Sequence, residues 1–324
     1  MAGPLRGVNL GGWLVLEPWL TPSLFANSTA TDEYTYCQQN QAAWRKLKQH
    51  RDTFITEKDF AWLAAHGIQA VRLPVGYWLF GDAAPYVETA SYVDKAFAWA
   101  KKHQLKVLID LHGAPGSQNG TMHSGQRGEV GWHKSPANIE QTLGVLTRIA
   151  ERYGKHSALL GISLLNEPSS KIPTAVLEDF YIRAYNLLRE HCPADAWMVF
   201  SDAFRPGRWH HKLARAKYPG IAIDHHHYQI YSWIDKRLPA HWQVWRTRYL
   251  LPFALRRIAR QHPLIVGEWS LALGRGDKSQ QAAYAHAQLA VFQTSAAWFY
   301  WTYKTEYGSI WSFRACYEQG LLPL

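Results

Sequence analysis

Eight short apolar runs, each separated from the next by a longer stretch, constrain the fold of this chain more than any other feature. They lack the polar alternation of a half-exposed strand, so each is expected to be a buried strand covered on both faces, as in a parallel sheet. Strands that alternate with helices predict an α/β fold, and eight of them predict a single (β/α)8 TIM barrel over residues 1–324. The eight predicted strands cover residues 5–10, 70–73, 106–110, 159–165, 197–200, 221–224, 264–268 and 297–301.

The stretches between the runs carry helical signals. The clearest is 135–153, where Ser135 is expected as the N-cap, Pro136 lies in the first turn and apolar residues follow along one face. Two stretches, 17–51 and 113–134, show no regular period and follow strands, so both should be long loops on the catalytic face of the barrel. The other expected helices cover 56–66, 90–103, 174–191, 240–261 and 278–294.

A length of 324 residues suits one barrel with insertions, so we expect one domain. A doubly wound open sheet is the alternative architecture. It would bind phosphate through a glycine-rich loop after the first strand, but Gly11-Gly12 lacks the third glycine and the following helix. The chain has three cysteines: Cys37, Cys192 and Cys316. Three cysteines cannot all pair with one another, so no disulfide framework is expected, and none of them has metal-ligand spacing.

The net charge of +10 raises the question of an anionic partner. The basic residues are scattered and no nucleic-acid motif accompanies them, so no nucleic-acid partner is expected. The densest group, five arginines within 246–260, falls in a predicted helix, where we expect a solvated face. Weak attraction to an acidic cell surface or polysaccharide is the alternative. No run has the length of a membrane span, so we expect a soluble protein. We also expect a monomer. It would be cytoplasmic as written, or secreted or periplasmic if a leader has been removed.

Two glutamates stand at the ends of apolar runs: Glu167 closes 161–167 and Glu268 closes 263–268. At this edge of a parallel barrel the side chains that carry out chemistry project. A pair of acids there is what cleavage of a glycosidic bond requires, one as proton donor and the other as nucleophile or base. We therefore predict that Glu167 and Glu268 are catalytic. The alternative is two structural acids in ion pairs, which is usual for an isolated glutamate.

Other polar and aromatic residues share these strand ends. Arg72, in the second run, needs an acidic partner because its charge is not lost by titration, and Glu268 is the natural candidate. His112 follows the third run and Trp301 ends the eighth, where an indole would form the floor of a pocket.

The segment His225-His226-His227-Tyr228 follows the sixth run and raises the hypothesis of a metal site. Strand alternation places His225 and His227 on one face and His226 and Tyr228 on the other, so three histidines cannot converge on one ion. No metal is predicted. We expect His226 and Tyr228 to face the barrel interior and to donate hydrogen bonds to a sugar and to the nucleophile.

Several longer motifs accompany these residues: 7–19, 32–34, 72–74, 110–120, 165–168, 226–229, 267–269, and Trp301 with 304–306. Together they resemble glycoside hydrolase family 5, and within it the yeast-type exo-β-1,3-glucanases. The resemblance extends from about Leu5 to Trp311.

The resemblance implies a retaining mechanism without a cofactor, in which Glu167 is the acid/base and Glu268 the nucleophile. Asn166 matches the residue that hydrogen-bonds the sugar 2-hydroxyl, and Glu17 matches a carboxylate that holds the terminal glucose. Tyr231 occupies the position of one aromatic residue of an acceptor clamp. The rest of the implied active-site set is Arg72, His112, His226, Tyr228 and Trp301.

The chain departs from the family pattern after residue 120. Fungal exo-glucanases continue there with an aromatic residue, an acid and an amide, whereas this chain has Thr121-Met122-His123. We expect this loop to affect specificity rather than catalysis. The sequence thus predicts a retaining β-glycoside hydrolase acting on β-glucans, similar to exo-β-1,3-glucanases. One alternative is a β-glucosidase or transglycosylase of short or lipid-linked β-glucosides, and another is a non-catalytic glucan-binding barrel.

Overall fold

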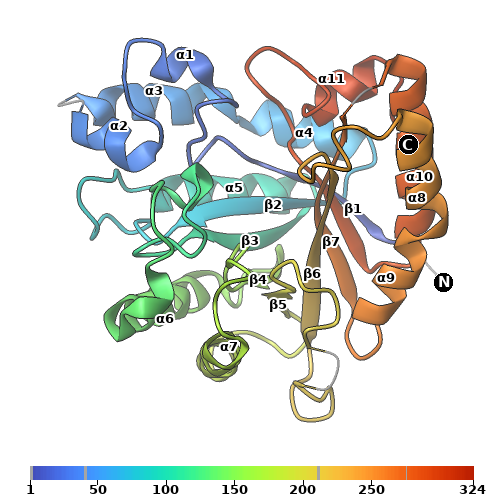
Figure 1. Cartoon of the computed structure of the whole chain (residues 1–324). Helices are drawn as coiled ribbons and strands as arrows, with labels where there is room; N and C mark the ends of the chain where they lie inside the picture. Colours follow the sequence, from blue (N-terminus) through green and yellow to red (C-terminus); the bar gives the residue numbers. More distant parts are fainter. Residues whose placement is uncertain (1–2, 40–41, 210–211, 275) are drawn as a thin grey trace.

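The computed structural model describes residues 3–39, 42–209, 212–274 and 276–324. All eight predicted runs form strands, which pair in parallel in sequential order until β8 closes on β1 (Figure 1). The prediction of a (β/α)8 barrel is confirmed, and the doubly wound open sheet is excluded. The strands are β1 (Leu5–Asn9), β2 (Ala70–Gly76), β3 (Lys106–Gly113), β4 (Leu159–Ser163), β5 (Trp197–Ser201), β6 (Ile221–Gln229), β7 (Leu264–Leu273) and β8 (Ala297–Tyr300).

Five of the six predicted helices form single helices: α4 (Glu57–Ala65), α5 (Ala90–Lys102), α6 (Pro136–Tyr153), α7 (Thr174–Arg189) and α10 (Lys278–Phe292). The sixth, 240–261, divides into α8 (Ala240–Tyr249) and α9 (Leu251–Ile258). Pro252 explains the division, because proline lacks an N–H and is tolerated only in the first turn of a helix. Ser135 stands at the N-cap of α6, but its side chain makes no capping hydrogen bond.

The prediction of an irregular loop over 17–51 is wrong in its described part. This segment contains α1 (Pro22–Phe25) and α2 (Glu33–Gln39) and most of α3 (Ala43–Phe54). A buried ion pair of 2.9 Å between Arg51 and Glu33 joins the last two helices. Charged residues therefore take buried positions that apolar ones usually fill, which hid the helical period. The segment 113–134 is irregular as predicted, apart from two 3₁₀ turns, η1 (Met122–Ser124) and η2 (Trp132–Lys134). A further helix, α11 (Phe313–Glu318), follows the last strand.

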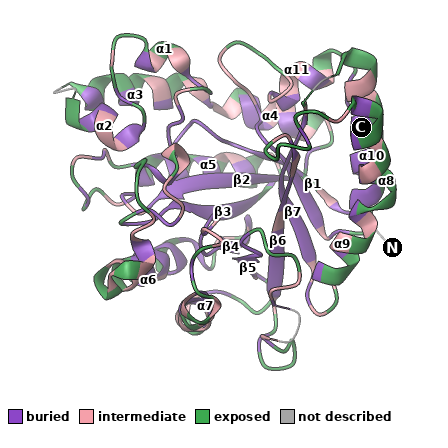
Figure 2. Ribbon diagram, in the orientation of Figure 1, coloured by how far each residue is buried: buried purple, intermediate pink, exposed green. Residues whose placement is uncertain are grey.

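The strands are buried along almost their whole length (Figure 2). One apolar cluster, which includes Leu108, Val199, Ile265 and Phe299, is drawn from strands all around the barrel, and a larger one includes residues of the strands and of the surrounding helices. Further along the strands the buried positions become polar, as at Arg72 and Asp224. Apolar packing thus supports a polar layer at the carboxyl ends of the strands, where active sites of this fold lie.

None of the helices in the described ranges combines the length and the hydropathy that crossing a bilayer requires. Cys37, Cys192 and Cys316 are buried free thiols.

Candidate active site

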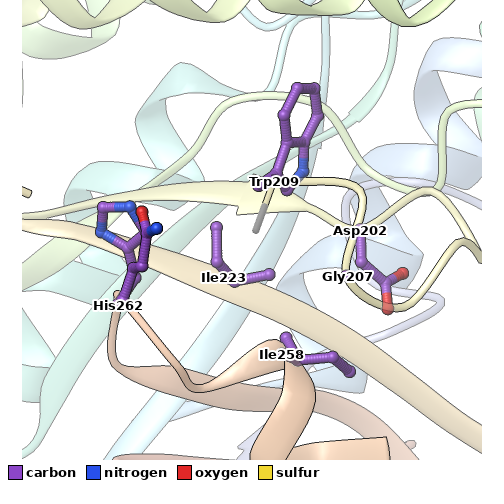
Figure 3. A pocket seen from close by; sticks show the side chains of 7 residues that line it. Asp202, Gly207, Trp209, Ile223, Ile258 and His262 are labelled. Atoms are coloured by element: carbon purple, nitrogen blue, oxygen red, sulfur yellow. The ribbon is translucent and has the colours of Figure 1, made fainter. Parts of the chain in front are cut away.

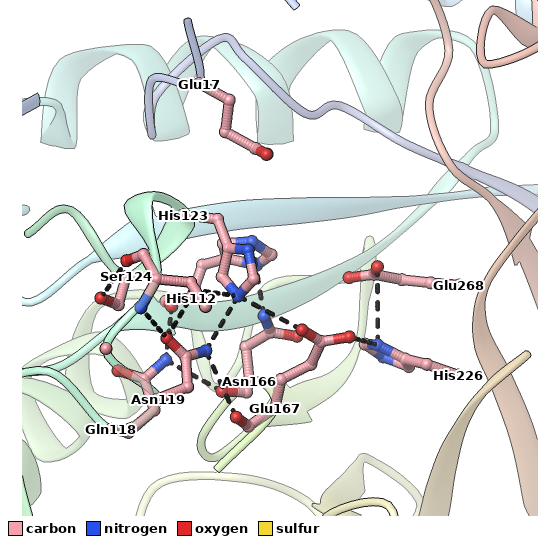
Figure 4. A network of polar contacts seen from close by, with 12 residues as sticks. Glu17, His112, Gln118, Asn119, His123, Ser124, Asn166, Glu167, His226 and Glu268 are labelled. Atoms are coloured by element: carbon pink, nitrogen blue, oxygen red, sulfur yellow. Dashed lines mark hydrogen bonds and ion pairs between the residues drawn. The ribbon is translucent and has the colours of Figure 1, made fainter. Parts of the chain in front are cut away.

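The carboxyl ends of the strands open into a cavity of about 720 Å³. In a closed barrel, residues at this end come from different strands and meet although they are far apart in sequence. Glu167 and Glu268 both line the cavity, and Figure 4 shows the polar network around them. The cavity is also lined by eight other residues that the sequence singled out: Glu17, His112, Thr121, Met122, His123, Tyr228, Tyr231 and Trp301.

The two glutamates lie close together. One carboxylate oxygen of Glu167, one of Glu268 and one ring nitrogen of His226 all lie within 4.8 Å of one another. Retaining glycosidases keep their carboxyl groups about 5–5.5 Å apart, whereas inverting enzymes separate them by about 6.5–9.5 Å. The spacing is therefore that of a nucleophile pair. Glu167 also has a φ of 43°, a left-handed conformation that costs a glutamate energy and that the surrounding fold must maintain.

Glu268 on β7 accepts hydrogen bonds from side chains of two other strands, β2 and β6. Arg72 Nη1 on β2 donates to its Oε1 at 3.1 Å, and the Tyr228 hydroxyl on β6 donates to its Oε2 at 2.9 Å. His226 Nδ1 lies 3.5 Å from the same Oε2. The contacts of Arg72 and Tyr228 with Glu268 that the sequence predicted are thus present. Such donors orient a carboxylate and favour its ionised form.

Arg72 is fully buried beneath the pair and balances two further acids. Its Nη2 lies 2.9 Å from Asp110 Oδ1 and 3.6 Å from Asp224 Oδ2. It also donates to the side-chain oxygens of Asn9 at 2.9 Å and Asn166 at 2.7 Å. A buried guanidinium with this many acceptors holds all of them in place, because moving it would leave several charges uncompensated.

The sequence prediction missed the roles of Asp110 and Asp224. Asp110 Oδ2 lies 2.6 Å from His112 Nδ1, and Asp224 Oδ2 lies 3.2 Å from His226 Nε2. Each aspartate therefore fixes the orientation of one histidine of the site. Both residues end predicted strands, which was an available signal, but a position at a strand end does not say which side chain it will face.

Two histidines contact Glu167. His226 Nδ1 lies 2.7 Å from its Oε1, and His123 Nε2 lies 3.2 Å from its Oε2. Asn119 Nδ2 lies 2.8 Å from the same His123 nitrogen and donates to the Glu167 carbonyl oxygen at 3.3 Å. The sequence placed His123 only in a specificity loop. The contact of His123 with Glu167 depends on the tertiary structure, because the 3₁₀ turn η1 carries the His123 side chain to Glu167.

The two histidines set the charge of the carboxylate pair. Burial raises the pKa of Glu167, but hydrogen bonds from His123 and His226 outweigh it and hold that pKa well below its usual value. Burial lowers the pKa of His123, but Glu167 more than compensates and raises it to about 9. For Glu268, burial raises the pKa to about 7. These directions favour a carboxylate at Glu167 beside a protonated histidine, whereas a general acid is simply expected to hold its own proton.

Glu17 and Trp301 form other parts of the cavity wall. Trp19 Nε1 donates to Glu17 at 2.8 Å, and burial raises the pKa of Glu17. The Trp301 ring stacks on His112, with centroids 5.4 Å apart and planes inclined by 6°. The buried indole is thereby held in one orientation while it still lines the cavity.

The outer part of the cavity is aromatic. Tyr231 is 69% exposed and packs edge-on against Tyr228, with centroids 5.7 Å apart. Trp311 packs on Tyr228 at 5.7 Å and on Trp19 at 5.3 Å. Trp19 and Trp311 were not predicted site residues, because nothing in a single sequence separates a tryptophan of a cavity wall from one of the core.

The histidine run behaves as strand alternation predicted. His226 faces the cavity network, whereas His225 Nδ1 lies 2.7 Å from Asp202 and His227 Nε2 lies 3.3 Å from Gln229. Among the described residues, Glu167, His226 and Glu268 do bring three possible metal-ligand atoms together. The Arg72 cation 3.1 Å from Glu268 opposes a second positive charge there, so the donor set fits proton transfer better than an ion.

The family described as Cellulase (glycosyl hydrolase family 5) matches residues 31–306. The chain belongs to glycosyl hydrolase family 5. It is 34% identical over 382 residues to the "Glucan 1,3-beta-glucosidase" of Schwanniomyces occidentalis, covering 98% of this chain and 87% of the relative. It is 36% identical over 376 residues to the "Probable glucan 1,3-beta-glucosidase A" of Aspergillus terreus, covering 98% and 88%. The predicted enzyme class, a retaining glycoside hydrolase, is confirmed.

Solved structures of related fold include rutinosidase from Aspergillus niger, with a TM-score of 0.86 and 19% identity over 99% of this chain and 98% of that one. Endo-glycoceramidase II from Rhodococcus sp. has a TM-score of 0.61 and 17% identity, over 96% and 75%. These similarities support the barrel architecture of this family 5 hydrolase.

Replacing His123 by Asn in this family 5 hydrolase should move the basic limb of its kcat/KM profile to higher pH. A protonated imidazole 3.2 Å from Glu167 favours the carboxylate, so an uncharged amide lets Glu167 keep its proton at higher pH. The other macroscopic pKa of the coupled pair should move in the same direction, because His123 acts on Glu268 as well as on Glu167.

The profile is measured by hydrolysis of an aryl β-glucoside between about pH 4 and 10, which spans these groups. His286→Asn, at an exposed histidine on α10, is the matched control and should leave both limbs unchanged. A basic limb that does not move in His123→Asn would show that His123 does not govern the protonation of Glu167.

A second cavity lies beside β6 and α9, lined by residues that include Trp209, Ile223, Ile258 and His262 (Figure 3). Its volume of about 10 Å³ holds at most one water molecule, and none of the network residues around Glu167 and Glu268 lines it. It is too small to bind a sugar.

Proposed function

We propose that this enzyme is a retaining β-glucosidase that releases glucose from the ends of β-1,3-glucan chains, with Glu167 as acid/base and Glu268 as nucleophile. The observation that carries the proposal is the approach of their carboxylate oxygens to within 4.8 Å inside the cavity. The relatives that match nearly the whole chain are glucan 1,3-beta-glucosidases by name, which supports this substrate class.

The reaction takes two steps. Glu268 attacks the anomeric carbon while Glu167 gives a proton to the leaving oxygen, so the glycosidic bond breaks and a glycosyl ester of Glu268 forms. Glu167 then removes a proton from water, whose oxygen attacks the anomeric carbon and releases the Glu268 carboxylate. Two successive inversions leave the β configuration unchanged.

The histidines reconcile these steps with the low pKa of Glu167. His226 Nδ1 and Glu167 Oε1 are 2.7 Å apart, so a proton between them can reside on either atom and the two groups together hold one transferable proton. As the glycosidic bond breaks, the leaving oxygen becomes more basic. It then draws this proton from Glu167 to itself. Arg72 and Tyr228 stabilise the charge of Glu268 during its attack.

Release of a terminal glucose requires a wall that meets the non-reducing end of the chain. Glu17 offers a buried carboxylate and Trp301 a flat apolar face, while Asn166 lies beside Glu167 with its side-chain oxygen fixed by Arg72. Tyr231 at the exposed side is suited to contact the next sugar. These placements support an exo mode, with the acceptor sugars on the side of Tyr231.

A product time course on laminari-oligosaccharides, cellobiose, gentiobiose and an aryl β-glucoside tests the proposal. We expect glucose as the first product from laminari-oligosaccharides, and its initial anomer by NMR to be β. An α anomer would contradict the retaining pair, and a mixture of longer oligosaccharides at early times would contradict the exo mode.

A second candidate is a β-glucosidase or transglycosylase of short or lipid-linked β-glucosides. It is favoured by the cavity residues Met122, Phe204 and Ile230, which are apolar. Met122 stands where the glucanases have an acid, so a sugar hydroxyl at this point lacks a charged partner. An apolar aglycone would contact these side chains without that loss.

Replacing Met122 by Asp should distinguish the two candidates. A buried hydroxyl that gains a charged partner is stabilised by about 1.5–3 kcal/mol, which corresponds to roughly a tenfold to hundredfold gain in kcat/KM. We expect the gain to be larger on laminari-oligosaccharides than on an aryl glucoside. Met122→Leu is the matched control and should leave the ratio of the two substrates unchanged, and an unchanged ratio in Met122→Asp would show that this loop does not set specificity.

We also infer that the enzyme is a single-domain monomer, because every residue of the proposed site comes from one barrel. Light scattering after size-exclusion chromatography should give a mass near 37.1 kDa, and twice that mass would contradict the inference.

A further inference from the structure

The helix α8 has its polar and apolar faces reversed relative to an ordinary surface helix. Most surface helices bury an apolar stripe and expose polar residues. In α8 the buried residues are Ala240, Gln243 and Thr247. The residues with half-exposed rings are Trp242, Trp245 and Tyr249. Packing against the barrel does not explain this arrangement, because the aromatic residues point away from it.

Several hydrogen bonds tie the polar inner face of α8 to the neighbouring segments. Gln243 Nε2 donates to the carbonyl oxygens of Gln229 at 2.7 Å and Asp235 at 2.9 Å, and Gln229 Nε2 donates to Thr247 Oγ1 at 2.6 Å. These bonds fix which face of the helix is turned inward. The aromatic residues are therefore held outward by the fold rather than by chance rotation of the helix.

Exposed apolar side chains concentrate around this helix. Twelve large hydrophobic residues are exposed in the described part of the chain, and seven of them lie between residues 233 and 253. They include the aliphatic Leu250 and, at 68% exposed, Phe253 on α9. So many exposed apolar residues in one short segment mark a surface that contacts something apolar.

The same part of the chain carries the positive charge. Residues 203–267 contain twelve Lys and Arg but only two acids, Asp224 and Asp235. The remainder has twenty-three basic and twenty-three acidic residues, so the whole net charge of +10 belongs to this segment. Arg248, Arg256 and Arg257 are exposed and make no ion pair with any described residue. The expectation that these arginines are merely a solvated face does not account for the aromatic residues beside them.

We propose that α8 and α9 form a surface that binds the anionic face of a phospholipid bilayer. This α8–α9 surface comprises Trp242, Trp245 and Tyr249 with Arg248, Arg256 and Arg257, and it lies on the outside of the barrel (Figure 1). Indole and phenol rings occupy the boundary between lipid headgroups and acyl chains, while arginines pair with the phosphates. Leu250 and Phe253, at the junction of the two helices, would insert between the headgroups.

Two other partners fit the surface less well. A neutral glucan would stack on coplanar rings, but the Trp242 and Trp245 planes are inclined by 72° and the Trp245 and Tyr249 planes by 44°. It would also gain nothing from the positive charge. A polyanion in water, such as a nucleic acid, would use the arginines but leave the aliphatic side chains of Leu250 and its neighbours exposed.

Cosedimentation of the full-length enzyme with vesicles tests the proposal. We expect binding to phosphatidylcholine vesicles with about 30% phosphatidylglycerol to be at least about tenfold tighter than to pure phosphatidylcholine, and to weaken as salt screens the arginines. Trp242→Ser with Trp245→Ser, and separately Arg256→Gln with Arg257→Gln, should each reduce binding by about tenfold or more.

Trp44→Ser with Arg45→Gln is the matched control, because this exposed tryptophan and arginine lie together on α3, with the guanidinium 5.1 Å from the ring. Its binding should equal that of the unmodified enzyme. All variants should hydrolyse a soluble aryl β-glucoside at the normal rate, which verifies folding and separates this proposal from the proposed function.

Three results would overturn the proposal. The first is equal binding to neutral and anionic vesicles, or none to either. The second is binding to dextran sulfate that depends on the arginines but not on the tryptophans, which would indicate a soluble polyanion. The third is retardation in a laminarin gel that Trp242→Ser with Trp245→Ser abolishes, which would indicate a glucan-binding surface.

Discussion

We expect Glu268→Gln to reduce kcat on an aryl β-glucoside by a factor of at least about 10⁴, as removal of the proposed nucleophile of a covalent mechanism should. The amide has nearly the same shape as the carboxylate and can keep a contact with Tyr228, so the fold should be unaffected. The loss is therefore one of reactivity, because an amide does not form the glycosyl ester. The rate is to be measured under saturating substrate, with circular dichroism as the check that the variant is folded.

Two comparisons make the result specific. Glu167→Gln should slow an aryl glucoside with a good leaving group far less than an alkyl glucoside, because a weakly basic leaving oxygen needs little protonation. Glu129→Gln replaces an exposed glutamate whose one ion-pair partner among the described residues is Lys134, and it should leave kcat unchanged. A Glu268→Gln enzyme that keeps more than a tenth of the activity would refute the assignment of the nucleophile.

We expect Arg72→Met to destabilise the protein by about 3–5 kcal/mol, the usual cost of removing one partner from a buried ion cluster. Asp110 and Glu268 then lose a guanidinium at 2.9 and 3.1 Å, and Asp224 loses one at 3.6 Å. No other Lys or Arg pairs with any of these three among the described residues. The free energy of unfolding is measured by urea denaturation near neutral pH.

The effect should depend on pH with a definite sign. Burial raises the pKa of Asp110, but Arg72 together with His112 and Ser163 outweighs it and holds that pKa below its usual value. Asp110 thus contributes stability that is complete above its unfolded-state pKa and is lost as the pH falls through the lower folded value. Arg72→Met should therefore show a weaker loss of stability on acidification than the unmodified protein.

Arg148→Met is the matched control, because Arg148 forms an exposed ion pair with Asp82 and should cost less than about 1 kcal/mol. Arg72→Lys is the second variant and keeps the charge without the planar fork that serves several acceptors at once. It should fold and lose activity. Equal stability of Arg72→Met and Arg148→Met would show that Arg72 does not hold the polar layer together.

The sequence was most informative where one residue type carries a strong physical constraint. Short apolar runs without polar alternation indicate buried strands, and this pattern predicted all eight strands. Arg72 lies within such a run and needs a buried acid as its partner, which predicted its contact with Glu268. The period of two along His225-His226-His227-Tyr228 separated the side chains that face Glu268 from those that do not.

The sequence was least informative where a contact joins two segments without a local signal. In the segment 17–51 a buried ion pair between Glu33 and Arg51 joins two helices where apolar contacts are more usual, and a periodicity based on apolar residues cannot detect it. The long helix expected over 240–261 is two helices, although Pro252 was visible, because a proline alone does not distinguish a kink from a new helix.

The sequence by itself determined the barrel, the pair of glutamates and the residues that had to surround them, because strand period and the cost of burying charge act within short segments. Only the tertiary structure decided which neighbours set the protonation of that pair. His123 reaches Glu167 through a 3₁₀ turn, and Asp110 and Asp224 reach the histidines and Arg72 through barrel closure. The outward direction of the α8 aromatic residues was likewise decided by hydrogen bonds of Gln243 and Thr247. Electrostatic and hydrogen-bonding contacts depend on distances between atoms, and the chain order does not contain those distances.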